Sequence, residues 1–380
     1  MSNPKEQLSA VRADIDSIDK ELISLLEKRM MCSEKVAEIK LAGNIAIMDE
    51  GREEEVLAHA KSNINEKYVA DSQTFMRNLL SLSRLRQARK ILPQQTVTMP
   101  KSSSLKSASC KQAAAKVGYQ GVKGAWGQAA AKSLFPNTSL LNFDYFEDIF
   151  TAINDGELDY GILPIENSQS GAIGEVYDLL RRYGLYIVKQ TWVDIAQCLL
   201  ALPDSNLADL REIYSHPEGF KQCYNFLKGK NLELTPTRNT AVAAELIKNS
   251  GDKSKGAIAS RTAAEEYGLE VLVPDIMDKK NNKTRFIVVA KAPEYDDQSN
   301  IISISFATAH KSGALTAVIE CFALAGLSLT RIESRPTGTG VDYRFFVDLD
   351  GNVSNPQTLA ALQNAAGHCE YFEILGCYGE

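Results

Sequence analysis

The sequence predicts a multidomain protein: an all-α module, then an α/β module, then a ferredoxin-like α+β module. At 380 residues the chain is too long for a single core. Hydrophobic residues recur at helical spacing from Lys5 to Leu92, almost uninterrupted except around Gly43 and Gly51. Apolar runs then alternate with helical segments over residues 113–292, which favours α/β architecture. The last part follows the order strand, helix, strand, strand, helix, strand, which is typical of a ferredoxin-like domain.

Linker composition sets the expected boundaries. Residues 93–112 are rich in serine, lysine and proline and have little to bury, so we assign a helical domain to 1–92, a linker to 93–112 and an α/β domain to 113–292. Within the α/β domain we expect strands at 160–165, 187–193, 198–202 and 287–290, and helices at 128–134 and 241–248. The last domain, 299–380, should contain strand 301–307, helix 313–324, strands 328–334 and 343–349, helix 358–366 and strand 371–377.

Composition points to an enzyme that acts on small molecules. Hydrophobic residues make up 44% and charged residues 24%, and the net charge of -6 gives no reason to expect nucleic acid or an anionic membrane surface. The seven cysteines are scattered without paired spacing, and the four histidines lack the spacing of a metal site. No apolar run is long enough to span a bilayer. We therefore expect a cytoplasmic enzyme with reduced thiols, no metal and no cofactor.

The expected strand 160–165 is followed by a cluster of short polar residues. Glu166, Asn167, Ser168, Gln169 and Ser170 precede Gly171. An open α/β sheet presents ligand-binding groups in this way at the carboxyl edge of its strands. An ordinary turn is the other interpretation, and the spacing leaves both open.

Further sequence segments of the α/β domain suggest anion binding. Residues 118–128 form a glycine-rich loop between a strand and a helix, where backbone N–H groups face an anion. Ser215 has the position of a helix N-cap, with Gln222 two turns later; capping alone would also account for this serine. Residues 282–289 read as a basic loop that enters a strand.

The first helix carries a cation on its apolar seam. The seam runs through Leu8, Val11, Ile15, Ile18, Leu22, Leu25, Arg29, Cys32, Val36 and Ile39. A guanidinium on a packed face needs an anionic partner, and Lys40, three turns after Arg29, points nearly the same way. Protein carboxylates such as Glu53 would satisfy both cations, or Arg29 would extend to water. On the last helix Ser83 and Gln87 interrupt an apolar stripe, so the interior also suits a small dianion that carries a hydroxyl.

The α/β domain resembles the prephenate dehydratase family in its segment from Pro164 to Ile173 and in Thr284-Arg285-Phe286. The resemblance implies two lobes like those of type II periplasmic binding proteins, with prephenate in the cleft. It implies that Thr284 is essential. Because a threonine hydroxyl is a poor acid near neutral pH, we expect Thr284 to donate a hydrogen bond to the leaving oxygen and Glu166, if burial keeps it protonated, to supply the proton. The implied substrate-binding residues are Asn167, Ser168, Ser215, Gln222, Arg285 and Phe286. Ala125-Trp126-Gly127 departs from the family pattern of a hydroxyl residue, an aromatic residue and serine.

The helical domain resembles the AroQ-type chorismate mutases. The resemblance implies an active site of Arg12, Arg29, Lys40, Asp49, Arg52, Glu53, Ser83 and Gln87, in which Lys40 and Gln87 donate to the ether oxygen during a pericyclic rearrangement. Arg12 lies about 100° around the helix from Arg29, which argues against its serving the same pocket. In the family this arginine reaches into the partner's site, within an interlocked six-helix dimer.

The last domain resembles the ACT regulatory domain in Gly313-Ala314-Leu315 and in Glu333-Ser334-Arg335-Pro336. The resemblance implies that these residues bind L-phenylalanine between paired domains. The three modules together resemble the bifunctional chorismate mutase/prephenate dehydratase family. This implies conversion of chorismate to prephenate and then to phenylpyruvate in phenylalanine biosynthesis, feedback inhibition by phenylalanine, and a homo-oligomer that is at least a dimer. The rival interpretations are an arogenate-using dehydratase and a non-catalytic phenylalanine-sensing protein; Arg29 and Thr284 argue against the sensor.

Overall fold

The computed structural model describes residues 3–91, 115–336 and 343–379, so the predicted linker at 93–112 lies outside the described residues. The chain divides into two compact units. One unit contains the N-terminal helices and Ile304–Glu373, and the other contains the α/β module up to Ser303 together with the residues from Ile374 onward. None of the described helices is sufficiently long and apolar to cross a membrane.

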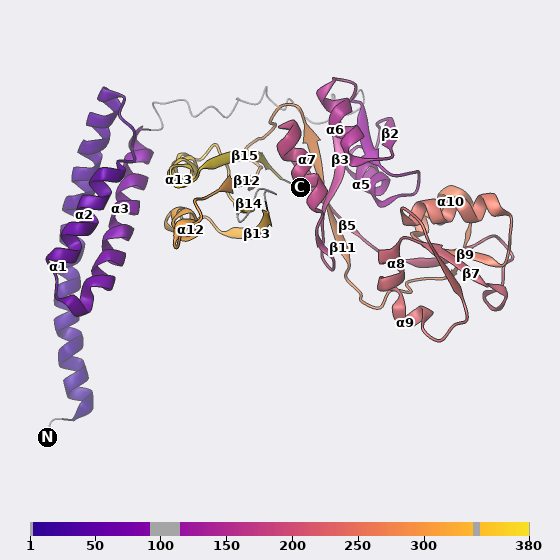
Figure 1. Cartoon of the computed structure of the whole chain (residues 1–380), viewed down its shortest axis with the longest axis horizontal. Coiled ribbons are helices and arrows are strands. Elements are labelled where there is room, and N and C mark those ends of the chain that lie inside the picture. The colour runs from indigo at the N-terminus through magenta and orange to yellow at the C-terminus, as the bar shows by residue number, and fades with distance from the viewer. Residues whose placement is uncertain (1–2, 92–114, 337–342, 380) are drawn as a thin grey trace. The chain divides into compact units, whose positions relative to one another are not determined.

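The N-terminal module is entirely helical over its described residues, which confirms the prediction. It consists of α1 (Pro4–Gly43), α2 (Glu50–Ser62), a short 3-10 turn η1 (Glu66–Tyr68) and α3 (Val69–Ile91). Helix α1 begins after Asn3, whose side chain accepts a hydrogen bond from the Lys5 N–H, and it ends where Asn44 takes a left-handed conformation. Asp49 caps α2 by accepting from the Arg52 N–H. Helix α1 continues well past the ends of α2 and α3 (Figure 1).

The first lobe of the α/β module contains a six-stranded sheet. Its strands are β1 (Val117–Gln120), β2 (Leu140–Phe143), β3 (Tyr160–Asn167), β4 (Gly171–Ala172), β5 (Tyr186–Asp194) and β11 (Lys283–Ala290), in the order β2-β1-β3-β11-β5 with β4 paired to β3. Strand β1 is parallel to β2 and β3, and β11 is antiparallel to both β3 and β5. The helices of this lobe are α5 (Trp126–Leu134), α6 (Phe146–Asn154) and α7 (Gly174–Tyr183).

The second lobe contains a five-stranded sheet of its own. Its strands are β6 (Cys198–Ala201), β7 (Glu212–Ser215), β8 (Glu233–Pro236), β9 (Lys255–Ala259) and β10 (Glu270–Val273), in the order β10-β6-β9-β7-β8. Its helices are η3 (Leu207–Asp209), α8 (Pro217–Gln222), α9 (Tyr224–Leu227), α10 (Thr240–Ser250) and α11 (Arg261–Tyr267). The chain crosses between the lobes after β5 and again after β10, so the predicted α/β architecture and its two lobes are confirmed.

Each lobe has a separate hydrophobic core. Tyr119, Ile162 and Val288 are buried together in the first lobe, and Leu200 and Ile247 belong to the core of the second. Burial of large side chains is the main favourable term in folding, so each lobe holds its own loops in place. Loops from the two lobes can therefore face one another as two separately folded walls.

The C-terminal module has the predicted order of elements. They are β12 (Ile301–Ala307), α12 (Ala314–Leu324), β13 (Leu329–Pro336), β14 (Tyr343–Asp350), α13 (Pro356–Ala366) and β15 (Tyr371–Tyr378). The four-stranded sheet has the order β13-β14-β12-β15, in which the first strand lies between the third and the fourth. This is the strand order of a split β-α-β unit, as the sequence pattern predicts.

Candidate active sites

A cavity of about 470 Å³ opens in the α/β module where several helices begin. The residues that precede α5, α7, α8 and α10 all line it: Ala125, Ile173, His216 and Asn239. The first N–H groups of a helix lack intrahelical partners and carry partial positive charge. Ala125 makes no side-chain capping bond. The cavity therefore suits a ligand with more than one negative group.

Strand β11 presents alternate residues to this cavity. Thr284 and Phe286 line it, whereas Arg285 between them does not. Successive side chains of a strand point to opposite faces, so this division follows from the strand itself. The Arg285 guanidinium instead lies with Nε 3.5 Å from the Glu166 carboxylate and Nη1 3.4 Å from the Gln190 side-chain oxygen.

A bulge in β3 determines which polar residues face the cavity. Thr284 pairs with Asn167 and Arg285 with Glu166, but Phe286 pairs with Pro164, so β3 holds one extra residue at this point. Pro164 and Asn167 line the cavity and Glu166 does not. This corrects the expectation that Glu166 faces the substrate. Without the bulge, period-two alternation would place Glu166 on the same face as Pro164.

The hydroxyls of two predicted serines, the buried Ser215 and the exposed Ser168, form hydrogen bonds with other residues of the protein. Ser215 is fully buried and donates its hydroxyl to the Ile258 carbonyl at 2.8 Å. It ends β7, and the N-cap of α8 is His216, so the predicted cap falls one residue too early. The Ser168 hydroxyl accepts from the Lys283 N–H at 2.9 Å. Neither serine lines the cavity, whereas Gln222 does and accepts a hydrogen bond from Gln197.

The capping interaction sets the protonation of His216. Its Nδ1 accepts the Glu218 N–H at 3.2 Å, so the neutral ring carries its proton on Nε2. Burial lowers the pKa of His216 from its ordinary value, which favours this neutral form. Glu218 and Arg238 also line the cavity, and the Arg238 guanidinium lies 2.8 Å from Asp144. The prediction missed these residues, although His216 and Glu218 lie between Ser215 and Gln222.

The helical module brings Arg29 and Ser83 together. The Arg29 guanidinium donates to the Ser83 hydroxyl and to the Leu79 carbonyl at 2.9 Å. Burial lowers the pKa of Arg29 from its ordinary value, but a guanidinium stays charged. One turn after Ser83, the side-chain oxygen of Gln87 is buried and has no hydrogen-bond partner among the described residues. Arg29 and Gln87 are therefore polar groups on an otherwise apolar face.

Glu53 does not pair with Arg29; it pairs with Arg84, which the prediction missed. Arg84 is 5% exposed, and its Nε donates at 2.9 Å to Asn364 of α13. The suggestion that Glu53 satisfies Arg29 is therefore wrong. Arg84 immediately follows Ser83 but lies off the Ser83–Gln87 stripe, so the periodicity of that stripe does not point to it.

The remaining predicted mutase residues lie at helix ends or on exposed surface. Lys40 donates to the Ile47 carbonyl at 2.5 Å. Asp49 is occupied as the cap of α2, and Arg52 forms an exposed ion pair with Glu55 at 2.9 Å. Arg12 is exposed in the first part of α1.

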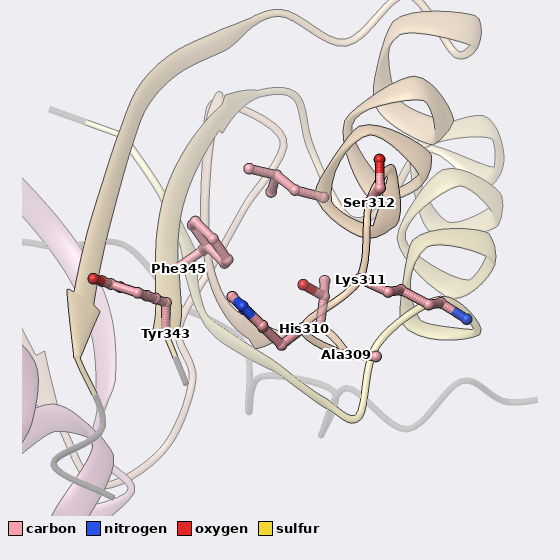
Figure 2. Close-up of a pocket in the computed structure, with 8 residues that line it drawn as sticks. Ala309, His310, Lys311, Ser312, Tyr343 and Phe345 are labelled. Atoms are coloured by element: carbon pink, nitrogen blue, oxygen red, sulfur yellow. The ribbon is translucent and has the colours of Figure 1, made fainter. Parts of the chain in front are cut away.

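A second cavity, of about 340 Å³, lies in the C-terminal module. Figure 2 shows Tyr343 and Phe345 of β14 opposite the loop that carries Ala309, His310 and Ser312, while the Lys311 side chain extends away from Phe345. Phe345 stacks on Phe306, with ring centroids 5.3 Å apart. Of the predicted regulatory residues, Leu315 lines this cavity and Gly313 caps α12 with φ at 82°. Ala314 begins α12, and the predicted residues Glu333, Ser334, Arg335 and Pro336 end β13 beside β14 and do not line the cavity.

The helical module and the α/β module each match a known protein family. Residues 11–88 match the family Chorismate mutase type II, and residues 117–294 match Prephenate dehydratase. A bifunctional chorismate mutase/prephenate dehydratase from Enterobacter agglomerans is 30% identical, over 99% of this chain and 97% of its own length. The chain belongs to the bifunctional chorismate mutase/prephenate dehydratase family. It is therefore an enzyme with a mutase domain and a dehydratase domain.

Two further relatives extend the comparison. Arogenate dehydratase/prephenate dehydratase 1 from Arabidopsis thaliana is 33% identical, over 73% of this chain and 75% of its own length. The crystal structure of prephenate dehydratase in complex with L-Phe from Arthrobacter aurescens has a TM-score of 0.64 at 27% identity. It covers 70% of this chain and 90% of that one. Among the described residues, no group of His, Cys, Asp and Glu side chains is arranged to hold a metal ion.

Proposed function

We propose that the cavity between the lobes binds prephenate and converts it to phenylpyruvate. The observation that carries the proposal is the Thr284 hydroxyl, which lines a cavity where α5 and α7 begin without a side-chain cap. These N-termini suit the two carboxylates of prephenate. The bond to the ring carboxylate breaks and its electron pair enters the ring, while the ring C–O bond breaks and the oxygen leaves with its pair. Carbon dioxide departs, and the leaving oxygen departs as hydroxide, which carries away one of the two negative charges and leaves the phenylpyruvate monoanion.

Thr284 stabilises this reaction as a hydrogen-bond donor. Negative charge develops on the leaving oxygen, and a fixed hydrogen-bond donor beside it lowers the barrier. A threonine hydroxyl is too weak an acid to supply the proton at neutral pH. His216, with its proton on Nε2, and Gln222 add donors from the second lobe. Ser168, Ser215, Arg285 and Glu166 support the walls of the cavity and do not bind the substrate.

We further propose that the helical module rearranges chorismate to prephenate. Arg29 would bind one carboxylate, and Lys40 and Gln87 would donate to the ether oxygen, where charge develops. The half-buried Arg29 without an ion pair among the described residues supports this, because a dianionic ligand supplies the missing charge. Ser83 holds the Arg29 guanidinium from α3.

A second copy of the chain would complete the mutase site. Helix α1 exposes its seam, including Ile15 at 49% and Ile18 at 57%, which is unusual for an apolar stripe of this length. Arg12 lies on the same extended part of α1 but about 100° from Arg29, so it would serve the partner's site. The exposed seam and the placement of Arg12 together support a homodimer. A cytoplasmic location stays a prediction.

We also propose that L-phenylalanine binds at the C-terminal module and inhibits the dehydratase. The cavity beside Leu315 combines aromatic walls from Tyr343 and Phe345 with the polar loop of His310 and Ser312 (Figure 2). An amino acid with an aromatic side chain matches both parts. The dehydratase relative crystallised with L-Phe supports this assignment. The predicted residues Glu333 to Pro336 end the neighbouring strand, where a second copy would close the site.

Arogenate is the alternative dehydratase substrate. It carries an amine where prephenate has a ketone, and the Glu218 carboxylate on the cavity wall favours an amine. One experiment tests these proposals: purified protein receives chorismate, prephenate or arogenate, each with and without phenylalanine. We expect mutase turnover of chorismate and release of phenylpyruvate from prephenate, which phenylalanine lowers. Release of phenylalanine from arogenate with no turnover of prephenate would overturn the substrate assignment.

A further inference from the structure

The side chain of Asn167 is buried in the network that surrounds Thr284. The two residues pair across the antiparallel strands β3 and β11, and each is 8% exposed. Both border the cavity. Asn167 is therefore in a position to act on the substrate directly or through Thr284, and its hydrogen bonds distinguish the two roles.

The orientation of the Asn167 amide follows from its backbone partners. Its Oδ1 receives the N–H groups of Gln169 and Ser170, both at 3.0 Å, and the Ser170 hydroxyl at 3.2 Å. A backbone N–H only donates, so the atom that faces these groups must be the oxygen. The Asn167 nitrogen therefore faces the opposite direction, toward Thr284.

The amide nitrogen can only donate to Thr284. Nδ2 lies 2.9 Å from the Thr284 hydroxyl oxygen, 2.7 Å from Asn282 Oδ1 and 3.2 Å from the Lys283 carbonyl. Its two hydrogens are directed at the two nearest acceptors, and the longer contact to the Lys283 carbonyl shares one of these hydrogens. The Thr284 oxygen thus accepts, and its own hydrogen is not used in this contact.

The Thr284 hydrogen has no protein acceptor among the described residues, and the cavity lies on its open side. We propose that Asn167 is a positioning residue: by donating to the Thr284 oxygen it directs the Thr284 hydrogen into the cavity, toward the leaving oxygen of the substrate. The inference rests on the proposed dehydratase function. In this role Asn167 does not bind the substrate, because Asn167 affects the reaction only through Thr284.

Asn167→Asp tests this role in the full-length protein. The substitution keeps the oxygen that holds Gln169 and Ser170 but replaces the amine with an acceptor, so the Thr284 hydrogen turns away from the cavity. We expect kcat for prephenate to fall about 100-fold, the range for loss of one oriented donor. KM is compared in Asn167→Ala, which adds no charge to the cavity and should keep KM within about threefold, whereas the carboxylate of Asn167→Asp repels a dianionic substrate.

Two controls separate this effect from damage to the loop. Asn282→Leu removes the other acceptor of the Asn167 amine and leaves the Thr284 contact, so kcat should stay within about threefold. Asn167→Ala also removes the donor, and it decides the question if the aspartate variant does not fold. A thermal melt of each preparation reports on the integrity of the dehydratase module.

The double variant Asn167→Ala/Thr284→Val gives the sharpest comparison. If Asn167 acts through the hydroxyl, the double variant is no slower than Thr284→Val alone. A further loss in the double variant, or a raised KM with unchanged kcat in Asn167→Ala, would overturn the inference and make Asn167 a binding residue. Wild-type protein that does not consume prephenate would refute the proposed function itself, a result distinct from either of these.

Discussion

Glu166→Gln distinguishes the observed site from the arrangement expected from the sequence. If Glu166 supplied a proton in the cavity, its loss would lower the dehydratase kcat by about 10²- to 10⁴-fold. In the structure the carboxylate lies on the opposite face of the sheet, 3.5 Å from Arg285, with 27% of its side chain exposed. The substitution should therefore affect stability and leave catalysis nearly unchanged.

The stability cost follows from the burial of the two partners. Breaking a fully buried ion pair costs about 3–5 kcal/mol, whereas an exposed pair contributes at most about 1 kcal/mol. The Arg285 side chain is 7% exposed, but the glutamine still offers it an oxygen, so we expect about 1–2 kcal/mol. For an α/β domain of this size that corresponds to a fall in Tm of about 2–8 °C.

The assay pairs steady-state kinetics on prephenate with a calorimetric melt of the same preparation. We expect kcat within about threefold of wild type and a lowered Tm, while Thr284→Val loses kcat at unchanged Tm. A kcat for Glu166→Gln at least 100-fold below wild type, with an unchanged melt, would refute the bulge argument and restore Glu166 as the acid.

Three further predictions concern separate parts of the chain. Lys40→Ala should lower mutase kcat by about 10²- to 10³-fold and leave dehydratase activity intact; equal loss of both activities would contradict separate sites. Ile18→Asp should weaken the dimer at least about tenfold in sedimentation velocity, because it places a charge on the seam that the proposed dimer buries. Lys20→Asp, on the opposite face of the helix, should not weaken it. Equal behaviour of the two variants would contradict a seam interface. His216→Asn keeps a capping oxygen and removes a group whose folded pKa lies below its ordinary value of 6.5. The contribution of His216 to the free energy of unfolding should therefore be lost as the pH drops below 6.5 and be constant above it, so in denaturant titrations the variant should lose less stability than wild type on acidification.

Secondary structure was predictable because it depends on local periodicity. The alternation of three- and four-residue spacings in α1, the apolar runs of β5 and β6, and the element order of the C-terminal module all follow from neighbouring residues. The same local rules identified Arg29 on an apolar seam, whereas Thr284 was identified by the resemblance of Thr284-Arg285-Phe286 to the prephenate dehydratases. Single functional residues on one helix or strand could therefore be predicted from the sequence.

Facing direction and long-range pairing were not predictable from the same patterns. One extra residue in β3 removes Glu166 from the cavity and places Asn167 opposite Thr284. No local sequence pattern predicts that bulge. Likewise Arg84 meets Glu53 only because α2 packs against α3.

The sequence by itself determined the modules, their order and the residue types available for catalysis, because hydrophobic period and turn chemistry act over a few residues. The tertiary structure alone decided which of those residues share a cavity. Strand register, helix packing and the convergence of helix N-termini arise from contacts between residues far apart in the chain, and a shift of one position in register reverses which face a side chain occupies.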